Sequence, residues 1–302
     1  MTCETMSRRC AHGPHEAAVK AKKAINNLIV VSDTHCGCRL GLCPPEGVAL
    51  DDGGRYEPSS AQQKVWSIWR DLWDEWVPRV TKGEPYDVVM NGDALDGVHH
   101  GAVTQVSQNL ADQATIAIAC LGEVAQCAHK SGGRYWHIRG TEAHVGKSAQ
   151  EEERLAQALG AVPNEAGQHA RWELWKRIGP GSGHLCHLLH HIGVTGSAAY
   201  ESTAVHKELT EAFVEAGRWG DEPPQVIVRS HRHRHYEIRI PIGAGYGIST
   251  VTPGWQLKTP FTYRIPGARV AQPQFGAVLI RAGDEELHSR SFVRRIERPK
   301  EE

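Results

Sequence analysis

Aspartate and histidine residues directly follow five short apolar segments of this 302-residue chain. Strands of one sheet that all end in such residues can place the side chains around a single point, so the pattern predicts one shared site. A mixture of carboxylate and imidazole groups suits a pair of Zn, Mn or Fe ions better than calcium or magnesium alone. In chain order, the residues are Asp33 and His35, Asp93 and Asp96, Glu142 and His144, His190 and His191, and His231 and His233.

The order of these residues resembles that of the calcineurin-like metallophosphoesterase superfamily. Its blocks read Asp-x-His, Gly-Asp-x-x-Asp, Gly-x-x-x-His, His and His-x-His, and the likeness covers residues 27–235. Four blocks match well, but one departs from the pattern. The family usually has Gly-Asn-His followed by an acid, whereas this chain reads Gly140-Thr141-Glu142-Ala143-His144. In that detail the chain is similar to phosphoesterases of phages and prophages.

The resemblance implies a fold and a mechanism. The fold would be an α/β (α+β) sandwich, with two mixed β-sheets packed face to face and flanked by helices. Two divalent metal ions would acidify a bridging water, and the hydroxide would attack a phosphomonoester or phosphodiester in line with the leaving oxygen. Asp93 would bridge the ions, and His144 is the candidate proton donor to the leaving oxygen. The other implied ligands are Asp33, His35 and His233 for the first ion and His190 and His231 for the second.

Two ligand assignments stay open at this point. Glu142 is the favoured further ligand of the second ion, because Thr141 offers only a neutral hydroxyl, and the same segment also suits a helix cap. His190 and His191 are neighbours on an extended segment, so only one of them can face the metals. We favour His190.

Several residues beside the ligands are expected to act without binding metal. Asp96 is expected to orient a ligand through a hydrogen bond. His99 and His100 follow it in a loop and are candidates for touching the substrate phosphate, with a solvated or packed loop position as the favoured alternative. Thr141 and His191 join this group if they are not ligands.

The composition is that of an ordinary soluble globular protein, with 40% hydrophobic and 23% charged residues. The formal net charge of −1 provides no overall field that would attract nucleic acid or an anionic membrane. Residues 1–24 lack the apolar core of a secretory leader, and no apolar run is long enough to span a membrane. We therefore expect a cytoplasmic protein with reduced thiols. The expected substrate is a phosphate ester, with nucleotides and nucleic acid as candidates, and the alternative is a catalytically weak, metal-bound scaffold or partner-binding module.

Hydrophobic periodicity predicts the elements that must position these residues. Residues 1–24 are expected to form a flexible tail and residues 25–302 a single metallophosphoesterase domain, whose C-terminal strands complete the second sheet. Helices are predicted over 60–76, 102–130, 149–159 and 204–216, and strands over 171–178, 237–242, 247–252, 261–265, 275–280 and 288–295.

Two further patterns have structural interpretations. Four tryptophans of the first helix share one helical face, which favours a core-facing surface over base stacking. They are Trp66, Trp69, Trp73 and Trp76. Cys36, Cys38 and Cys43 lie beside the first motif, but no fourth ligand is near in the sequence, so a structural role is favoured over a third metal site.

Overall fold

The computed structural model describes residues 24–99, 101–146, 149–193, 198–243, 245–265, 269, 271–283 and 286–297. The tail predicted for residues 1–24 therefore lies outside the described residues, except for residue 24. None of the described helices combines the length and the apolar character that a membrane-spanning helix needs.

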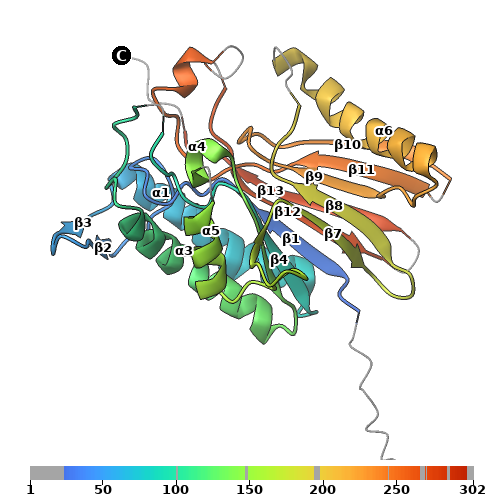
Figure 1. Cartoon of the computed structure of the whole chain (residues 1–302), viewed down its shortest axis with the longest axis horizontal. Helices are drawn as coiled ribbons and strands as arrows, with labels where there is room; N and C mark the ends of the chain where they lie inside the picture. Colours follow the sequence, from blue (N-terminus) through green and yellow to red (C-terminus); the bar gives the residue numbers. More distant parts are fainter. Residues whose placement is uncertain are drawn as a thin grey trace, which may run out of the picture.

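Two mixed β-sheets form the centre of the fold (Figure 1). The first sheet has the spatial order β13 (Leu287–Arg294), β12 (Phe275–Ala282), β1 (Asn27–Val31), β4 (Tyr86–Asn91), β5 (Tyr135–Ile138) and β6 (Ala170–Arg171). The second has the order β10 (Tyr236–Ile242), β11 (Gly245–Val251), β9 (Val226–Arg229), β8 (His184–Leu189) and β7 (Glu173–Ile178). Parallel pairs at both centres, β1 with β4 and β8 with β9, bring the carboxyl ends of neighbouring strands together.

The inner faces of the two sheets share one buried core. Leu28 and Val30 of β1 and Val278 of β12 contribute from the first sheet. Leu188 of β8 and Val228 of β9 contribute from the second. Because residues of both sheets belong to one cluster, the sheets pack face to face.

Helices flank this sandwich on both outer faces (Figure 1). On the first sheet, α1 (Ser60–Arg70) contacts β12, α3 (Leu110–Lys130) contacts β4, and α5 (Gln150–Ala158) contacts β6. On the second sheet, α6 (Glu201–Trp219) contacts β9, β10 and β11. The predicted α/β sandwich of two mixed, helix-flanked sheets is confirmed.

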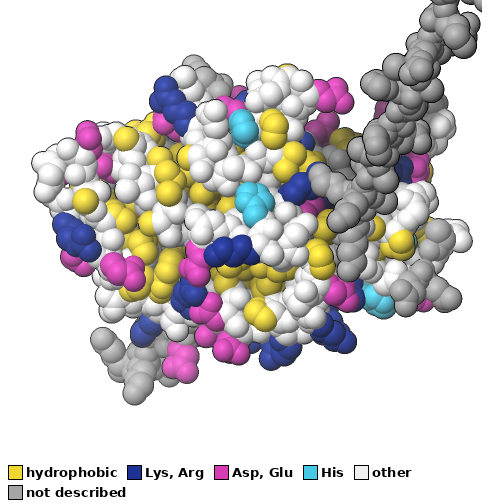
Figure 2. All heavy atoms as spheres, turned by 90° about the horizontal axis from the view of Figure 1, so that it is seen from below, with side chains coloured by type: hydrophobic (Ala, Val, Ile, Leu, Met, Phe, Trp, Pro, Cys, Tyr) yellow, Lys and Arg dark blue, Asp and Glu magenta, His cyan; other side chains and the backbone are white. Residues whose placement is uncertain are grey.

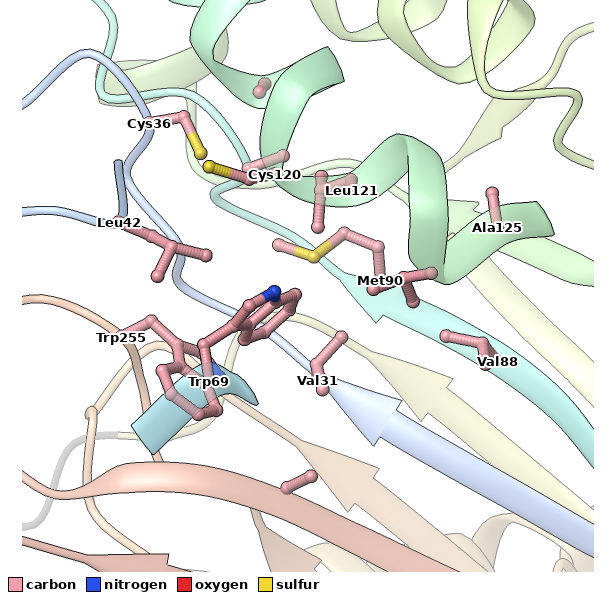
Figure 3. Packing of buried hydrophobic residues seen from close by; sticks show 14 of the residues in the cluster. Val31, Cys36, Leu42, Trp69, Val88, Met90, Cys120, Leu121, Ala125 and Trp255 are labelled. Carbon is pink, nitrogen blue, oxygen red and sulfur yellow. The ribbon is translucent and has the colours of Figure 1, made fainter. Parts of the chain in front are cut away.

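The tryptophan stripe faces the core, as predicted. The helix that carries it runs from α1 through a π-helical turn, η1 (Asp71–Trp76), into α2 (Val77–Thr81). Trp69 is fully buried, with its ring 4.7 Å from that of Trp255 and perpendicular to it (Figure 3). Trp76 is buried too, and Trp66 and Trp73 pack partly buried against the same cluster.

The cysteines near the first motif are buried free thiols. Cys36, Cys38 and Cys43 lie in the interior, and Figure 3 shows Cys36 beside Cys120 of α3 among apolar side chains. Among the described residues, the potential metal-ligand groups contain no cysteine. This buried placement agrees with the structural role that the sequence favoured for the three cysteines.

Two predicted elements differ from the structure, and one short hairpin was not predicted. Residues 261–265 hold a 3-10 turn, η3 (Thr262–Arg264), and not a strand, because the hydroxyl and carbonyl of Thr259 both accept from the Thr262 N–H. The helix predicted over 102–130 begins only at Leu110, where the side chain of Asn109 caps it. Residues 36–58 also contain a short hairpin of β2 (Val48–Ala49) and β3 (Arg55–Tyr56).

The expected completion of the second sheet by the C-terminal strands needs a correction. β10 and β11 join that sheet, but β12 and β13 belong to the first. β12 is buried along almost its whole length, so it requires neighbours on both edges, and it pairs with β1 and β13.

Candidate metal centre

The motif residues begin where the central strands end. Asp33 and His35 follow β1, and their backbone N–H groups donate to the carbonyls of Gly92 (3.0 Å) and Asp93 (3.1 Å), which follow β4. In the second sheet, the N–H of Ser230 donates to the carbonyl of His190 at 2.9 Å. These bonds connect the loops that follow neighbouring parallel strands, β1 with β4 in the first sheet and β8 with β9 in the second.

Potential ligand atoms gather in three groups, two of which share His35, and within each group all atoms lie within 4.8 Å of one another. The first two groups are the sets that the family resemblance implied for the two ions, apart from the bridge. The third contains the candidate proton donor. The groups are Asp33, His35 and His233; Asp93, His190 and His231; and His35, Asp96 and His144.

The first two groups touch each other. His190 Nε2 lies 3.0 Å from Asp93 Oδ2 and 3.9 Å from Asp33 Oδ1. His233 Nε2 lies 3.2 Å from the same Asp33 oxygen and 3.0 Å from His35 Nε2. Both carboxylates therefore face one small space that four imidazoles surround, His231 Nδ1 being 3.8 Å from Asp93 Oδ2.

The residues of this space fit a bound cation. Asp33 Oδ1, Asp93 Oδ2 and His190 Nε2 are buried side-chain atoms without a hydrogen bond of normal geometry. Buried polar atoms nearly always have partners, so three such atoms beside one another need an explanation. Carboxylate oxygens with imidazole nitrogens are the donor set of Zn, Mn and Fe sites.

The backbone is strained at the same residues. Of seven described non-glycine residues with positive φ, five are motif residues. Their φ values lie between 42° and 72°, a left-handed conformation that costs L residues free energy and that is concentrated at functional sites. They are Asp33, His35, Asp93, His231 and His233.

Two glycines make room for the cluster. A Cβ on Gly140 would lie 2.0 Å from Asp93 Oδ1, and a Cβ on Gly92 would lie 2.3 Å from His190 Nδ1. A side chain at either position would displace a carboxylate or an imidazole of the centre. The glycines of these motifs are therefore required by packing.

The electrostatics favour positive charge in the centre. Burial acts to raise the pKa of Asp33, but the positive charges of His233 and His190 outweigh it and lower the pKa to about 2. Burial acts to lower the pKa of His190, but the charges of Asp93 and Asp33 raise it to about 10. Burial, together with the charge of His144, lowers the pKa of His35 to about 4. The carboxylates thus stay ionised, and His190 supplies a proton where a cation would fit.

Asp96 contacts two histidines of the centre. Its carboxylate Oδ1 lies 3.4 Å from His35 Nδ1, which leaves His35 Nε2 facing His233. Its backbone carbonyl accepts a hydrogen bond from His144 Nδ1 at 2.6 Å, which leaves His144 Nε2 3.8 Å from Asp93 Oδ2. The carboxylate of Asp96 thus lies beside the ligand His35, as the predicted orienting role expects, but the hydrogen bond that the structure contains joins the Asp96 backbone to His144.

In the divergent block, residues 140–144, Thr141 supports the carboxylate of Asp93. Its N–H and its hydroxyl both donate to Asp93 Oδ1, at 2.8 and 3.3 Å, so it holds the carboxylate that would bridge the ions. Glu142 is exposed at the start of α4 (Glu142–Val145), and none of the three ligand groups found among the described residues includes it. The structure does not bring this predicted ligand into the cluster.

The remaining predicted residues lie at the edge of the centre. His191 is exposed and its ring centroid is 5.4 Å from that of His190, outside the ligand groups of the described chain. His99 Nε2 lies 3.7 Å from Asp96 Oδ2, with its ring 4.4 Å from that of His144. His100 lies outside the described residues.

Sequence patterns alone missed several residues that support the ligands. Glu152 of α5 is fully buried, and its two carboxylate oxygens accept from the backbone N–H groups of Gly140 (2.9 Å) and Ala94 (3.3 Å). Gln105 and Gln256 donate to the two oxygens of Asp96, at 3.0 and 3.3 Å. An acid on the buried face of a helix was the available signal for Glu152, whereas the two glutamines gave none.

Comparison with known proteins adds little. No protein-family model and no curated protein sequence matches the chain. Among solved structures, the Thermotoga maritima protein TM1076 is similar over 90% of this chain and 100% of its own, at 10% identity and a TM-score of 0.34. Vacuolar Protein Sorting 29 from Cryptosporidium parvum is similar over 91% of this chain and 100% of its own, at 9% identity and a TM-score of 0.34. Likenesses this slight leave the function to be inferred from the site.

Proposed function

We propose that the protein is a metal-dependent phosphoester hydrolase of the calcineurin-like metallophosphoesterase superfamily. The observation that carries the proposal is the meeting of two ligand groups at the unpartnered oxygens of Asp33 and Asp93. The order of the sequence motifs and the two-sheet sandwich support it. The cofactors would be two divalent ions, Mn, Zn or Fe.

Each residue of the centre has a role in this proposal. Asp93 would contact both ions, and Thr141 holds its other oxygen. Bound divalent ions acidify water and polarise phosphoryl oxygens, which is the chemistry that the side chains themselves lack. The further ligands would be Asp33, His35 and His233 on one side and His190 and His231 on the other.

His144 would supply a proton to the leaving oxygen. Because a carbonyl can only accept, the bond to the Asp96 carbonyl fixes the Nδ1 proton of His144 and directs Nε2 toward the centre. The imidazolium form then carries its second proton on Nε2. A donor in this position accelerates departure of a poor leaving group by about 10²–10⁴-fold.

The proposed substrates are small phosphate esters, nucleotides included, ahead of duplex nucleic acid. The net charge is −1, and on the face shown in Figure 2 basic and acidic side chains are interspersed. Tight duplex binding depends on gathered positive charge. Single-stranded nucleic acid is also included among the candidates, because its binding depends less steeply on neutralised phosphates than that of a duplex.

A second function has one observation in its favour. Glu142 lies outside the ligand cluster. The second ion would therefore lack the one protein ligand that the divergent block was expected to provide. A weakly bound second ion would suit a metal-bound scaffold or partner-binding module.

A panel of substrates separates these functions. Purified protein would be stripped of metal, reloaded with manganese, zinc or no metal, and offered a phosphomonoester, a phosphodiester and single-stranded DNA. Metal-dependent turnover of at least one substrate is expected. Stable metal binding without turnover of any of them would overturn the hydrolase and leave the scaffold.

A further inference from the structure

Beneath the centre runs a chain of four buried polar side chains, none of which is a proposed ligand. They come from four separate segments, and each is fully inaccessible to solvent. The hydroxyls of Ser32 and Thr252 are 2.6 Å apart, those of Thr252 and Ser230 are 2.7 Å apart, and Asn91 Nδ2 lies 2.6 Å from Ser230 Oγ.

The two ends of this chain reach ligands of both proposed ions. At one end, Ser32 Oγ donates to Asp33 Oδ2 at 2.5 Å. At the other, the backbone carbonyl of Asn91 accepts from His190 Nδ1 at 2.7 Å. The polar chain therefore connects a carboxylate of the first ligand group with an imidazole of the second.

The direction of every hydrogen bond in this chain is fixed by its ends. Asn91 Nδ2 also donates to the carbonyl of Leu189 at 3.2 Å, which shows that the amide nitrogen faces Ser230. An ionised carboxylate such as Asp33 can only accept. Ser230, Thr252 and Ser32 must then each donate toward Asp33. Hydrogen bonds aligned in this way strengthen one another in a buried setting.

This alignment decides which oxygen of Asp33 is available to a cation. Oδ2 accepts from Ser32 and from the backbone N–H of His231 at 3.3 Å. Oδ1 has no hydrogen-bond partner and lies 3.2 Å from His233 Nε2. Without the polar chain, only the longer bond from the His231 N–H would hold Oδ2, and the orientation of the carboxylate would be less fixed.

We propose that Thr252, together with Ser230, is a positioning residue of the metal centre, which holds Asp33 in the orientation that binds a cation through Oδ1. The inference rests on the proposed metal centre but not on the hydrolysis of any substrate. Partners outside the ligand set commonly change metal affinity by about 10–100-fold. Thr252 is the central link, since it contacts the hydroxyls on both sides.

The neighbouring strand offers a matched control. Ser249 and Thr250 of β11 are as buried as Thr252, but their hydroxyls have no hydrogen-bond partner. Thr250→Val therefore makes the same chemical change at an equally buried position, without interrupting the chain that ends at Asp33.

The test is manganese affinity of metal-stripped protein, measured by competition with a chromophoric chelator. Thr252→Val should weaken the tighter manganese site by about 10-fold or more, whereas Thr252→Ser, which keeps the hydroxyl, should stay within about twofold of the wild type. Thr250→Val should also stay within about twofold. Ser230→Ala breaks the next link and should weaken binding in the same direction, which keeps the test valid if Thr252→Val does not fold.

Several outcomes would overturn the positioning role. They are wild-type affinity in Thr252→Val and Ser230→Ala, equal weakening in Thr250→Val, failure of Thr252→Ser to restore affinity, or a wild-type protein that binds no manganese. Manganese binding by the wild type without hydrolysis of any ester would instead remove the hydrolase function and leave the affinity comparison intact.

Discussion

His190 Nε2 lies 3.0 Å from Asp93 Oδ2 in the interior, whereas the adjacent His191 is exposed. The backbone carbonyl of Asn91 accepts from His190 Nδ1, so the opposite nitrogen is directed at the carboxylate. This pair connects the two sheets at the ends of β4 and β8. Of the two neighbouring histidines, His190 is therefore buried beside a carboxylate and His191 faces solvent.

His190→Ala should therefore lower the metal content by about one ion per chain, because one imidazole of the second ligand group is lost. His191→Ala serves as the matched control, since it removes an identical side chain one residue away. Its metal content should equal that of the wild type. Elemental analysis of both variants checks this, and the reverse pattern would show that His191 is the ligand.

The proposed acid, His144, can be tested through the leaving group. His144→Ala should slow substrates with poor leaving groups by about 10²–10⁴-fold and slow nitrophenyl esters much less, because an activated leaving group departs without the proton. Rates for an alkyl and a nitrophenyl ester of phosphate, at equal metal content, give the comparison. Equal slowing of both substrates would assign His144 to positioning the phosphate instead.

Glu142 can be tested by charge removal. The sequence assigned it to the second ion, and the structure leaves it exposed outside the ligand groups of the described residues. If it binds metal when the centre is loaded, Glu142→Gln should weaken manganese binding and depress both ester types together. Unchanged affinity and rates would show that the second ion lacks this ligand, as the geometry suggests.

Metal uptake should depend on pH through His190. Burial opposes its protonation, but Asp93 and Asp33 raise its pKa to about 10, so in metal-free protein it is a cation near neutral pH. A metal ion must displace the Nε2 proton, and manganese affinity should rise by up to about tenfold per unit between about pH 6.5 and 8.5. His35, with its pKa lowered to about 4, is neutral throughout and adds nothing to this slope.

Calorimetry in two buffers of different ionisation enthalpy would count the released protons. Release of about one proton per chain is expected near pH 7.5. His191→Ala should keep both the slope and the proton release. Affinity that does not change with pH, with no proton released, would contradict the assignment of His190.

Much of the fold and of the site could be predicted from the sequence because the signals are local. Apolar runs that end in Asp or His mark the central strands, and the strand ends then bring together groups such as Asp33 with His233. The place of β12 in the first sheet was not predictable in this way, since its pairing with β1 joins residues far apart in the chain. Its apolar sequence shows burial but not which sheet provides it.

The supporting residues were harder to predict for a related reason. Ser32 and Thr252 are 220 positions apart, and a hydroxyl gives no sign in the sequence of the partner it will meet. For Glu142, the sequence suggested a closer approach to the metals than the structure shows. Its place in a motif suggested a ligand, but the short helix α4 begins there and leaves its side chain in solvent.

The most direct test of the two-metal hydrolase is a titration of metal-stripped protein with manganese, in which bound metal and hydrolysis of nitrophenyl phosphate mono- and diesters are followed together. The wild type should bind two ions per chain, with hydrolysis appearing as the second binds. Asp93→Asn should bind less metal and show no turnover, because the shared carboxylate loses the charge that holds two cations together. Saturation at one ion or none, full activity in Asp93→Asn, or two bound ions without hydrolysis of either ester would contradict the account.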